Sequence, residues 1–350
     1  MKSYRVTGYG AALEAQDDAT PTPSGTEVLL RTSACGVCHS DVHLWEGYFE
    51  LGGGKRLELG RGSAEIPFTP GHEIAGEVIA MGPEASGVSV GDHRVAYPWI
   101  GCGGCGPCQR GEENLCTRPR NLGVNVDGGF SDHVLVPHPR YLHDLTHIPD
   151  SLACTYACSG LTSFGAVKKA DFMGAGESLM IIGAGGVGLM GVRFAQAVLG
   201  TKPIVIDIDE GRRQAAVEAG AAAAYDPNDR DAAKQIFKDT GGGVAAAIDF
   251  VGAEQTTQYG FRALRNGGKL IIVGLFGGEF RTPIPMLPFR GITIVGSYVG
   301  TPAEMSEMVA MLRAGEVDPI PIETRELTRA TETLNDLKEG RIVGRTVLVP

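Results

Sequence analysis

The sequence predicts an α/β protein with two domains, one a doubly wound parallel sheet and the other β-rich and discontinuous in sequence. At 350 residues the chain is too long for one comfortable hydrophobic core, so two domains are the default. From about Leu152 to Ser297, apolar strands alternate with helices, which indicates a parallel sheet covered on both faces. Short β-branched runs precede that stretch, and two helices and a strand follow it.

The β-rich domain is expected first along the chain. Its β-branched runs are broken by glycine and proline, which is typical of an irregular domain of barrel type, with strands at residues 27–32, 74–80, 93–97 and 133–137. The last elements, helices at 303–314 and 329–339 and a strand at 345–349, are expected to return to it. The predicted boundaries are therefore residues 1–152 plus 298–350 for this domain and 153–297 for the other.

The parallel sheet is expected from strands and helices that alternate in the middle of the chain. Strands are predicted at residues 178–182, 203–207, 222–225, 244–250, 269–273 and 292–296. Helices are predicted at 186–199, 210–219, 230–238 and 254–264.

Composition restricts the class of protein. Apolar residues make up 43% and charged residues 21%, as in a soluble globular protein, and the net charge of −10 disfavours nucleic acid and anionic membranes as partners. No apolar run is long enough to cross a bilayer, and the N-terminal residues lack the apolar segment of a signal peptide. A cytoplasmic protein whose cysteines stay reduced is therefore expected.

Half of the eight cysteines lie in one segment, CGGCGPCQRGEENLC, at Cys102, Cys105, Cys108 and Cys116. Two-residue gaps let neighbouring thiolates bind one ion, so the spacing predicts a closed, tetrahedral structural zinc site in a lobe at about residues 99–118. The alternative, disulfides in a secreted protein, is disfavoured by the missing signal peptide.

A second motif, GAGGVG at Gly183–Gly188, directly follows an apolar strand and opens a helix, the context of a Rossmann dinucleotide site. Asp207 ends the next strand, where its carboxylate can accept hydrogen bonds from the adenosine ribose and would repel a 2′-phosphate, which favours NAD over NADP. The alternative is a glycine-rich turn beside a solvated aspartate. The residues predicted to bind the cofactor through this motif are Gly183, Gly185, Gly186, Val187 and Gly188.

Together with CGVCHSD, GHE, CSGLTSFGA and the terminal GRTVL, these motifs make essentially the whole chain similar to the zinc-dependent medium-chain alcohol dehydrogenases. The resemblance implies a GroES-like catalytic domain, a Rossmann domain that binds NAD, and two zinc ions per chain, one catalytic and one structural. It implies reversible hydride transfer from a primary or secondary alcohol, held on zinc as its alkoxide, to NAD, which gives an aldehyde or a ketone.

The resemblance also implies a catalytic zinc site. Cys38, His72 and Cys158 match its three ligands and would leave a fourth position open for water or the substrate oxygen. Cys154 lies one helical turn before Cys158 but lacks the S-G-L-T context, so Cys154 and Cys35 are expected to be small buried hydrophobic residues.

The same resemblance implies roles for four residues beside these ligands. Asp41 would orient the imidazole ligand, and Glu73 would either approach the metal during ligand exchange or balance nearby positive charge. Ser40 and His43 would form a relay that carries the alcohol proton through the ribose to the surface, although His43 could be an ordinary surface-loop histidine.

Further residues match contacts to the cofactor or the substrate. His39 and Arg345 would contact the pyrophosphate and Arg212 the ribose, and residues matching the surroundings of the nicotinamide are Thr162, Val251 and Val273. Residues 46–67 form a longer segment than in compact relatives and are expected to border the substrate entrance. Trp45 and Trp99 are candidates for the pocket wall, with a purely structural role nearly as well supported for Trp45.

Several other functions are compatible with parts of the sequence. A polyol dehydrogenase or carbonyl reductase of the same superfamily is the nearest, but polyol enzymes often replace one thiolate ligand by a carboxylate. A zinc-free quinone reductase would need neither ligand set, and a non-catalytic NAD-binding protein would not need the open site. The expected partners are a small alcohol, aldehyde or ketone and copies of the chain itself, in a tetramer or, second, a dimer that pairs through residues 292–300.

Overall fold

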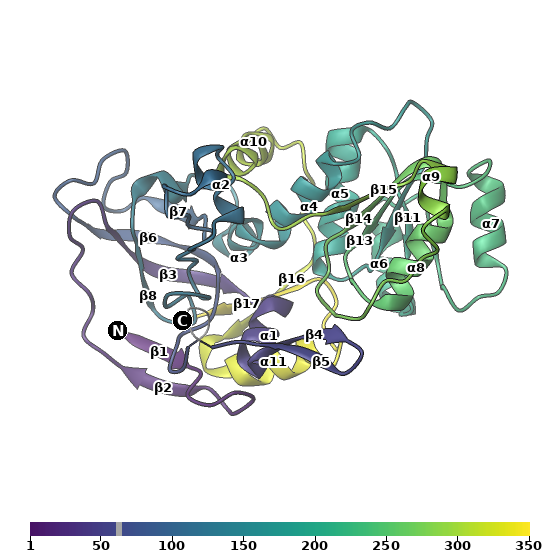
Figure 1. The fold of residues 1–350 in the computed structure, drawn as a ribbon. Coiled ribbons are helices and arrows are strands. Elements are labelled where there is room, and N and C mark those ends of the chain that lie inside the picture. The colour runs from purple at the N-terminus through teal and green to yellow at the C-terminus, as the bar shows by residue number, and fades with distance from the viewer. Residues whose placement is uncertain (61–64) are drawn as a thin grey trace.

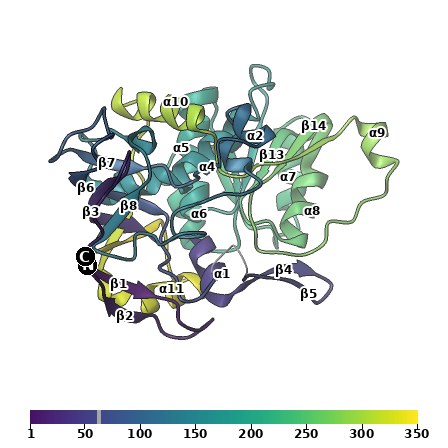
Figure 2. The ribbon, with the colours of Figure 1, turned by 60° about the vertical axis from the view of Figure 1, so that its left-hand side comes forward.

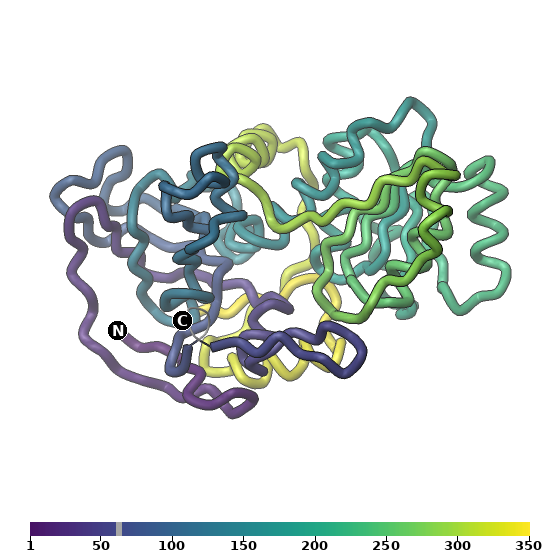
Figure 3. The backbone as a smooth tube through the Cα atoms, in the orientation of Figure 1, coloured from purple at the N-terminus to yellow at the C-terminus, as the bar shows by residue number. Residues whose placement is uncertain are grey.

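The computed structural model describes residues 1–60 and 65–350 and has two bodies joined side by side, a β-rich one and one built on a parallel sheet (Figure 1). The predicted fold class is confirmed. Both chain termini lie on the β-rich body (Figure 3). In the described ranges no helix combines the length and the apolar character that crossing a membrane requires.

The parallel sheet has six strands in the order β12-β11-β10-β13-β14-β15. The strand order reverses between β10 and β13, and in such sheets ligands bind at the carboxyl ends of the strands beside this reversal. The strands are β10 (Leu179–Ile182), β11 (Ile204–Ile206), β12 (Ala223–Tyr225), β13 (Val244–Asp249), β14 (Leu264–Ile272) and β15 (Thr293–Gly296).

Helices cover both faces of this sheet, and the buried side chains of β10 show why. Leu179 and Ile181 belong to a core shared with Leu189 of one helix, whereas Met180 and Ile182 alternate into a second core. The helix α8 packs against β13 and β14, and Figure 2 shows it beside them. The helices of this body are α4 (Ser159–Lys168), α5 (Gly186–Leu199), α6 (Glu210–Glu218), α7 (Ala232–Asp239), α8 (Glu254–Ala263) and α9 (Met286–Arg290).

The β-rich body contains a sheet in the order β16-β17-β3-β6-β7-β9, and β8 also pairs with β3. The C-terminal strand β17 runs antiparallel to β3, with Leu348 opposite Cys35, so the tail joins the N-terminal half of the chain as expected. The strands are β3 (Val28–Gly36), β6 (Glu73–Met81), β7 (His93–Ala96), β8 (His133–Val136), β9 (Leu142–His143), β16 (Ile322–Glu326) and β17 (Arg345–Val349). The domain boundaries at residues 152 and 297 stay a prediction.

The remaining elements surround this sheet. They are β1 (Lys2–Arg5) with β2 (Glu14–Asp17), β4 (Tyr48–Gly52) with β5 (Lys55–Glu58), and the helices α1 (His39–Glu46), α2 (Gly106–Gln109), α3 (Asp150–Ala153), α10 (Pro302–Arg313) and α11 (Ala330–Lys338). Short 3₁₀ turns are η1 (Glu113–Leu115), η2 (Pro139–Tyr141), η3 (Cys154–Ala157) and η4 (Leu327–Arg329).

Several of the described elements differ from the sequence prediction. β3 continues to Gly36 because its last residues, weak in strand propensity, pair with both β6 and β17. β14 begins five residues early, at Leu264, which pairs with Val244 across an irregular register. Within the segment 46–67, β4 and β5 form a hairpin, and residues 61–64 of that segment lie outside the described residues.

Candidate functional site

Cys38 occupies the turn between the end of β3 and the start of α1. It is the N-cap of α1, and its backbone N–H donates to Oδ2 of Asp41, 2.8 Å away, at the third helical position. A carboxylate at this place also complements the positive end of the helix. The sequence CHSD therefore fixes the thiol of Cys38 through a cap.

The second oxygen of Asp41 holds the loop that carries His72. Oδ1 lies 3.2 Å from the backbone N of Gly71 and 3.1 Å from Nδ1 of His72. A proton on Nδ1 leaves Nε2 as the nitrogen with a free lone pair. Nε2 of His72 is buried and has no protein hydrogen-bond partner.

Cys158, between η3 and α4, completes a buried group with Cys38 and His72. The three ligand atoms lie within 4.8 Å of one another, and the two sulfurs are 4.0 Å apart. Two zinc–sulfur bonds of about 2.3 Å at a tetrahedral angle place sulfurs about 3.8 Å apart, so the spacing fits one ion. The contact with Cys158, helped by His72, lowers the pKa of Cys38 well below its usual value.

Neither remaining buried cysteine belongs to this group in the described residues. The thiol of Cys154 faces the carbonyl of Ser151 at 3.5 Å, and that of Cys35 faces the carbonyl of Gly36. Burial raises the pKa of both thiols well above the usual value. The structure therefore places both as neutral, buried side chains.

Glu73 is fully buried behind the three ligand residues. Its Oε1 accepts a hydrogen bond from the backbone N of Ser159 at 3.0 Å, and its Oε2 pairs with the guanidinium of Arg345. Burial raises the pKa of Glu73, and the charge of Arg345 opposes that rise. Glu73 thus balances positive charge in this structure.

Arg345 also lies against the glycine motif. A Cβ added to Gly186 would fall 2.1 Å from Cδ of Arg345. Its side chain is 5% exposed, and its guanidinium pairs with the carboxylate of Glu73. The arginine expected at the pyrophosphate is therefore a buried link between the glycine loop and the back of the cysteine–histidine group.

The two relay candidates lie on α1, but His43 is not at the surface as predicted. Its ring is 9% exposed and packs against Phe49 of the β4–β5 hairpin, with ring centroids 4.7 Å apart, and against His39 at 5.6 Å. Burial and the neighbouring His39 lower the pKa of His43. Ser40, three residues before His43, is half-buried.

The glycine motif has the close contacts that a dinucleotide site requires. A Cβ on Gly188 would fall 1.8 Å from the carbonyl oxygen of Gly183, so only glycine allows α5 to approach the strand this closely. Around Gly185, the N-cap of α5, a Cβ would meet nothing within 4 Å, which leaves room for a pyrophosphate at the helix N-terminus. Ser163 supports the loop by donating to the carbonyl of Val187 at 2.7 Å.

Asp207 directly follows β11 beside this loop and is nearly buried. Its Oδ2 accepts from the backbone N of Ala184 at 2.7 Å, and its Oδ1 from that of Asp209 at 2.9 Å. Arg212 is expected at the same ribose, and this contact stays a prediction. Its guanidinium donates to the carbonyl oxygen of Gly340 at 2.9 Å and so ties α6 to the tail.

The three residues expected near the nicotinamide lie on separate elements. Thr162 follows Cys158 on α4, and its backbone N donates to the Cys158 carbonyl at 2.7 Å. Val251 packs against Gly183. Val273 follows the end of β14, and its backbone N donates to the carbonyl of Asp249. The buried carboxylate of Asp249 also accepts from the backbone N of Val251 at 3.0 Å, a role that sequence reasoning missed.

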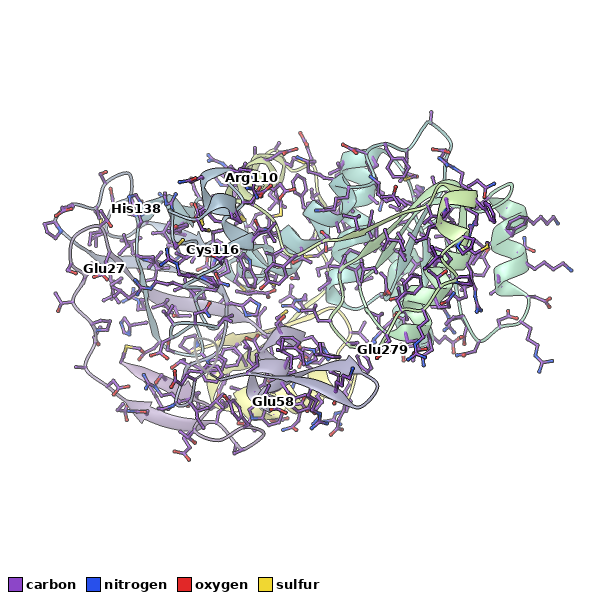
Figure 4. All side chains as sticks on the ribbon, viewed as in Figure 1. Glu27, Glu58, Arg110, Cys116, His138 and Glu279 are labelled. Atoms are coloured by element: carbon purple, nitrogen blue, oxygen red, sulfur yellow. The ribbon has the colours of Figure 1, made fainter. Side chains whose placement is uncertain are left out.

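The four clustered cysteines also come together, in the lobe of α2 and η1. The Sγ atom of Cys105 lies 3.4 Å from that of Cys108 and 3.8 Å from that of Cys116, which Figure 4 labels. Hydrogen bonds from the backbone at Cys108 and Thr117 lower the pKa of Cys105 to about 6. Four sulfurs around one point match a closed site, whereas the buried group supplies three ligands.

The two tryptophans differ in their relation to the buried group. The indole of Trp99 lies 5.3 Å from the His72 ring and donates to the carbonyl oxygen of Ala157. Trp45 donates instead to the carbonyl of Ala11, and the ammonium of Lys338 lies over its ring. At 3% and 4% exposure, neither indole has much surface to offer a substrate.

The hairpin β4–β5 reaches the parallel-sheet body. A Cβ on Gly52 would lie 2.7 Å from the backbone of Gly278, and one on Gly277 would lie 2.4 Å from the carbonyl oxygen of Glu50. Figure 4 labels Glu58 and Glu279 on the two sides of this contact. The hairpin thus crosses between the two bodies on the side where Phe49 covers His43.

Comparison with known proteins agrees with this geometry. Residues 186–314 match the zinc-binding dehydrogenase family, and residues 24–150 match the alcohol dehydrogenase GroES-like domain. The chain is 38% identical to the NAD-dependent alcohol dehydrogenase of Sulfurisphaera tokodaii and 37% identical to that of Saccharolobus solfataricus, over 100% of each chain. Its fold is similar to the alcohol dehydrogenase from the hyperthermophilic archaeon Aeropyrum pernix, with a TM-score of 0.89 and 30% identity over 100% of both chains.

Proposed function

The chain belongs to the zinc-dependent medium-chain alcohol dehydrogenases, and from this premise we propose which of its residues carry the reaction. It is an enzyme that uses zinc and NAD to interconvert alcohols with aldehydes or ketones. The observation that carries the assignment of the site is the buried, unpartnered Nε2 of His72 beside two thiols. A buried nitrogen without a partner is costly unless a ligand occupies the space it faces.

Cys38, His72 and Cys158 would hold the catalytic zinc, and Cys102, Cys105, Cys108 and Cys116 the structural zinc. When bound, the catalytic ion polarises the alcohol oxygen and lowers its pKa towards neutrality. Asp41 holds the imidazole of His72 in the ligating tautomer. Glu73 and Arg345 offset each other's charge behind the ligands, so that the site stays dry without an unpaired buried charge.

The proton leaves the site through α1. The hydroxyl of Ser40 would take the proton of the alcohol, and the ring of His43 on the same helix would accept it on the way to water. Because Phe49 and His39 pack against the His43 ring, the proton would pass these two side chains on its way to water. The low pKa of His43, which burial causes, keeps its ring neutral and able to accept that proton.

The cofactor would lie along the carboxyl ends of β10 and β11. Bound there, NAD would supply the nicotinamide ring that accepts the hydride. Backbone N–H groups at Gly185–Gly188 would hold the pyrophosphate and Asp207 the ribose, while Thr162, Val251 and Val273 would pack around the nicotinamide. Arg345 would support the pyrophosphate from beneath Gly186.

Replacing Asp207 tests the ribose assignment. Asp207→Asn keeps an oxygen that can accept from the N–H of Ala184 but removes the negative charge. The KM for NAD should therefore rise about tenfold, and the preference for NAD over NADP should become smaller. Steady-state kinetics with both cofactors measures the change. Asp209→Asn is the control, because that carboxylate caps α6. An unchanged NAD preference in Asp207→Asn would show that the ribose lies elsewhere.

Metal content and turnover together test the function as a whole. The purified chain should contain two zinc ions and should form NADH when an alcohol and NAD are added. Prolonged chelation should remove the zinc and abolish NADH formation, and added zinc should restore both. Elemental analysis and absorbance at the NADH band are the measurements. One zinc ion and no turnover would leave only the structural lobe and reject the redox assignment.

Copies of the chain are proposed to associate through the edge of the parallel sheet. β15 is the last strand in the order, and Ile294 on it is 37% exposed; Phe289 of α9 and Ile284 are exposed as well. An apolar edge strand that meets its copy across a two-fold axis loses its unpaired backbone groups. The proposal is a dimer through β15, two of which form a tetramer, in the cytoplasm.

A further inference from the structure

A buried carboxylate that the proposed reaction does not use lies at the carboxyl end of β13. Asp249 is the last residue of this strand and is fully buried, and it pairs with Ile182 of β10 and Ile272 of β14. In a doubly wound sheet of this strand order, the second half of a dinucleotide binds on the side of β13 and β14. Asp249 therefore lies at the edge of the sheet where the nicotinamide half of the cofactor would bind.

Four donors converge on the carboxylate of Asp249. Its Oδ1 accepts from the backbone N–H groups of Val251 and Gly252, each at 3.0 Å. Its Oδ2 accepts from the hydroxyls of Thr256 and Thr257 in the first turns of α8, at 2.9 and 2.8 Å. Burial raises the pKa of Asp249, and these hydrogen bonds oppose the rise. A buried carboxylate with partners on both oxygens is a fixed anchor for the turn between β13 and α8.

The main chain of Asp249 holds a second turn, the one after β14. Its carbonyl oxygen accepts from the backbone N of Val273 at 2.9 Å and from that of Gly274 at 3.0 Å. The two turns also interlock, because a Cβ on Gly252 would lie 1.9 Å from the carbonyl oxygen of Gly274. Asp249 thus holds the turn that carries Val251 with its side chain and the turn that carries Val273 with its main chain.

The strand itself is held without this carboxylate. β13 pairs with β10 on one side and with β14 on the other in parallel ladders that reach Asp249, and all its residues are buried. What the carboxylate adds is the position of Val251, whose Cγ2 would lie 2.6 Å from a Cβ on Gly183, the first glycine of the nucleotide motif. The side chain of Asp249 therefore acts on the turn beside the nucleotide loop rather than on the sheet.

We propose that Asp249 is a positioning residue for the nicotinamide half of the cofactor, which it places by holding Val251 and Val273. This rests on the proposed function, in which these two valines pack around the nicotinamide. Asp249 itself touches neither cofactor nor substrate and acts only through the two turns. Because a misplacement of about 1 Å between reacting groups can lower a rate about a hundredfold, a loosened turn should slow the hydride step.

Calorimetric titration with NADH and with ADP-ribose, which lacks the nicotinamide, separates the two halves of the cofactor site. Asp249→Ala leaves the N–H groups of Val251 and Gly252 without their acceptor. The Kd for NADH should therefore rise about tenfold, whereas the Kd for ADP-ribose should change by no more than about twofold. Asp239→Ala is the matched control in the same body, because its exposed carboxylate bonds only to side chains, and it should change neither Kd.

Two further variants test the hydrogen bonds themselves. Asp249→Asn keeps an oxygen for the two backbone N–H groups, and its amide can donate to the threonine hydroxyls, so the Kd for NADH should stay within about threefold of the parent. Thr257→Val keeps the shape of the side chain and removes one donor to Oδ2. It should raise the Kd for NADH about threefold with the Kd for ADP-ribose unchanged, and it gives this result even if Asp249→Ala does not fold.

A deuterated alcohol supplies a second readout. In Asp249→Ala the kcat should fall about tenfold or more and the primary deuterium isotope effect on kcat should rise, since the hydride step becomes slow. A purely structural role would lower the amount of active protein and leave the isotope effect unchanged.

Equal weakening of NADH and ADP-ribose binding, or parental values in both Asp249→Ala and Thr257→Val, would overturn the positioning role. Should the unaltered chain bind NADH but oxidise no alcohol, the proposed function fails. Should it oxidise alcohols while the Asp249 and Thr257 variants keep the parental ratio of the two Kd values, only this inference fails.

Discussion

Cys38→Ser is expected to lower kcat about a thousandfold or more and to reduce the zinc content from two ions per chain to one. The substitution keeps the size of the side chain and its place at the N-cap of α1, so the fold should survive. What it removes is a thiolate whose pKa is already held low by Cys158 and His72. A serine hydroxyl is not ionised at neutral pH, and loss of the catalytic ion removes several kcal/mol of stabilisation from the transition state.

Cys154→Ser supplies the matched control for this experiment. Cys154 is equally buried and lies one helical turn before Cys158, but its thiol faces the carbonyl of Ser151, where a hydroxyl can replace it. Activity and zinc content should therefore stay near those of the parent. Steady-state kinetics and elemental analysis on both variants decide the matter, and the ligand assignment is wrong if Cys38→Ser retains two zinc ions and full turnover.

The sequence predicted the fold class and named the three residues of the buried group, because each is tied to a local motif. Cys38 needs Asp41 three residues later, and the glycines of the nucleotide loop need close contacts within one strand–helix unit. Such contacts are short in sequence and follow from cap and turn chemistry. This is why motif spacing alone was enough for these residues.

What the sequence missed depends on contacts between distant segments. His43 is covered because the β4–β5 hairpin places Phe49 against its ring. The composition of this hairpin did not predict it, since all four residues of β5 are exposed and form no apolar pattern. The hydrogen bond from Arg212 to the carbonyl oxygen of Gly340 joins positions 128 apart in sequence. The side chain of Asn114 donates to the carbonyl oxygen of Tyr298, 184 positions away, and no local sequence pattern predicts this hydrogen bond.

Arg345→Met should produce the largest loss of stability among single substitutions near the site. The guanidinium of Arg345 and the carboxylate of Glu73 are 5% and 0% exposed, and they come from strands 272 positions apart in sequence. Removing the arginine leaves the carboxylate buried beside a thiolate without a compensating charge. Breaking a buried pair in this way costs about 3–5 kcal/mol, which corresponds to roughly 4–7 °C in Tm for a chain of 350 residues.

Differential scanning calorimetry of the zinc-loaded protein measures the loss of stability. Two further variants are the controls that show whether the unpaired buried charge causes it. Arg329→Met breaks the ion pair with Glu332, whose partners are 47% and 53% exposed, and should change Tm by no more than a degree or two. The double variant Glu73→Gln with Arg345→Met removes both charges and should recover at least half of the loss, because the penalty comes from the unpaired charge. Arg345→Met should also raise the KM for NAD, since its side chain packs beneath Gly186. If Arg345→Met melts no earlier than Arg329→Met, the buried pair does not couple the catalytic strand β6 to the cofactor loop.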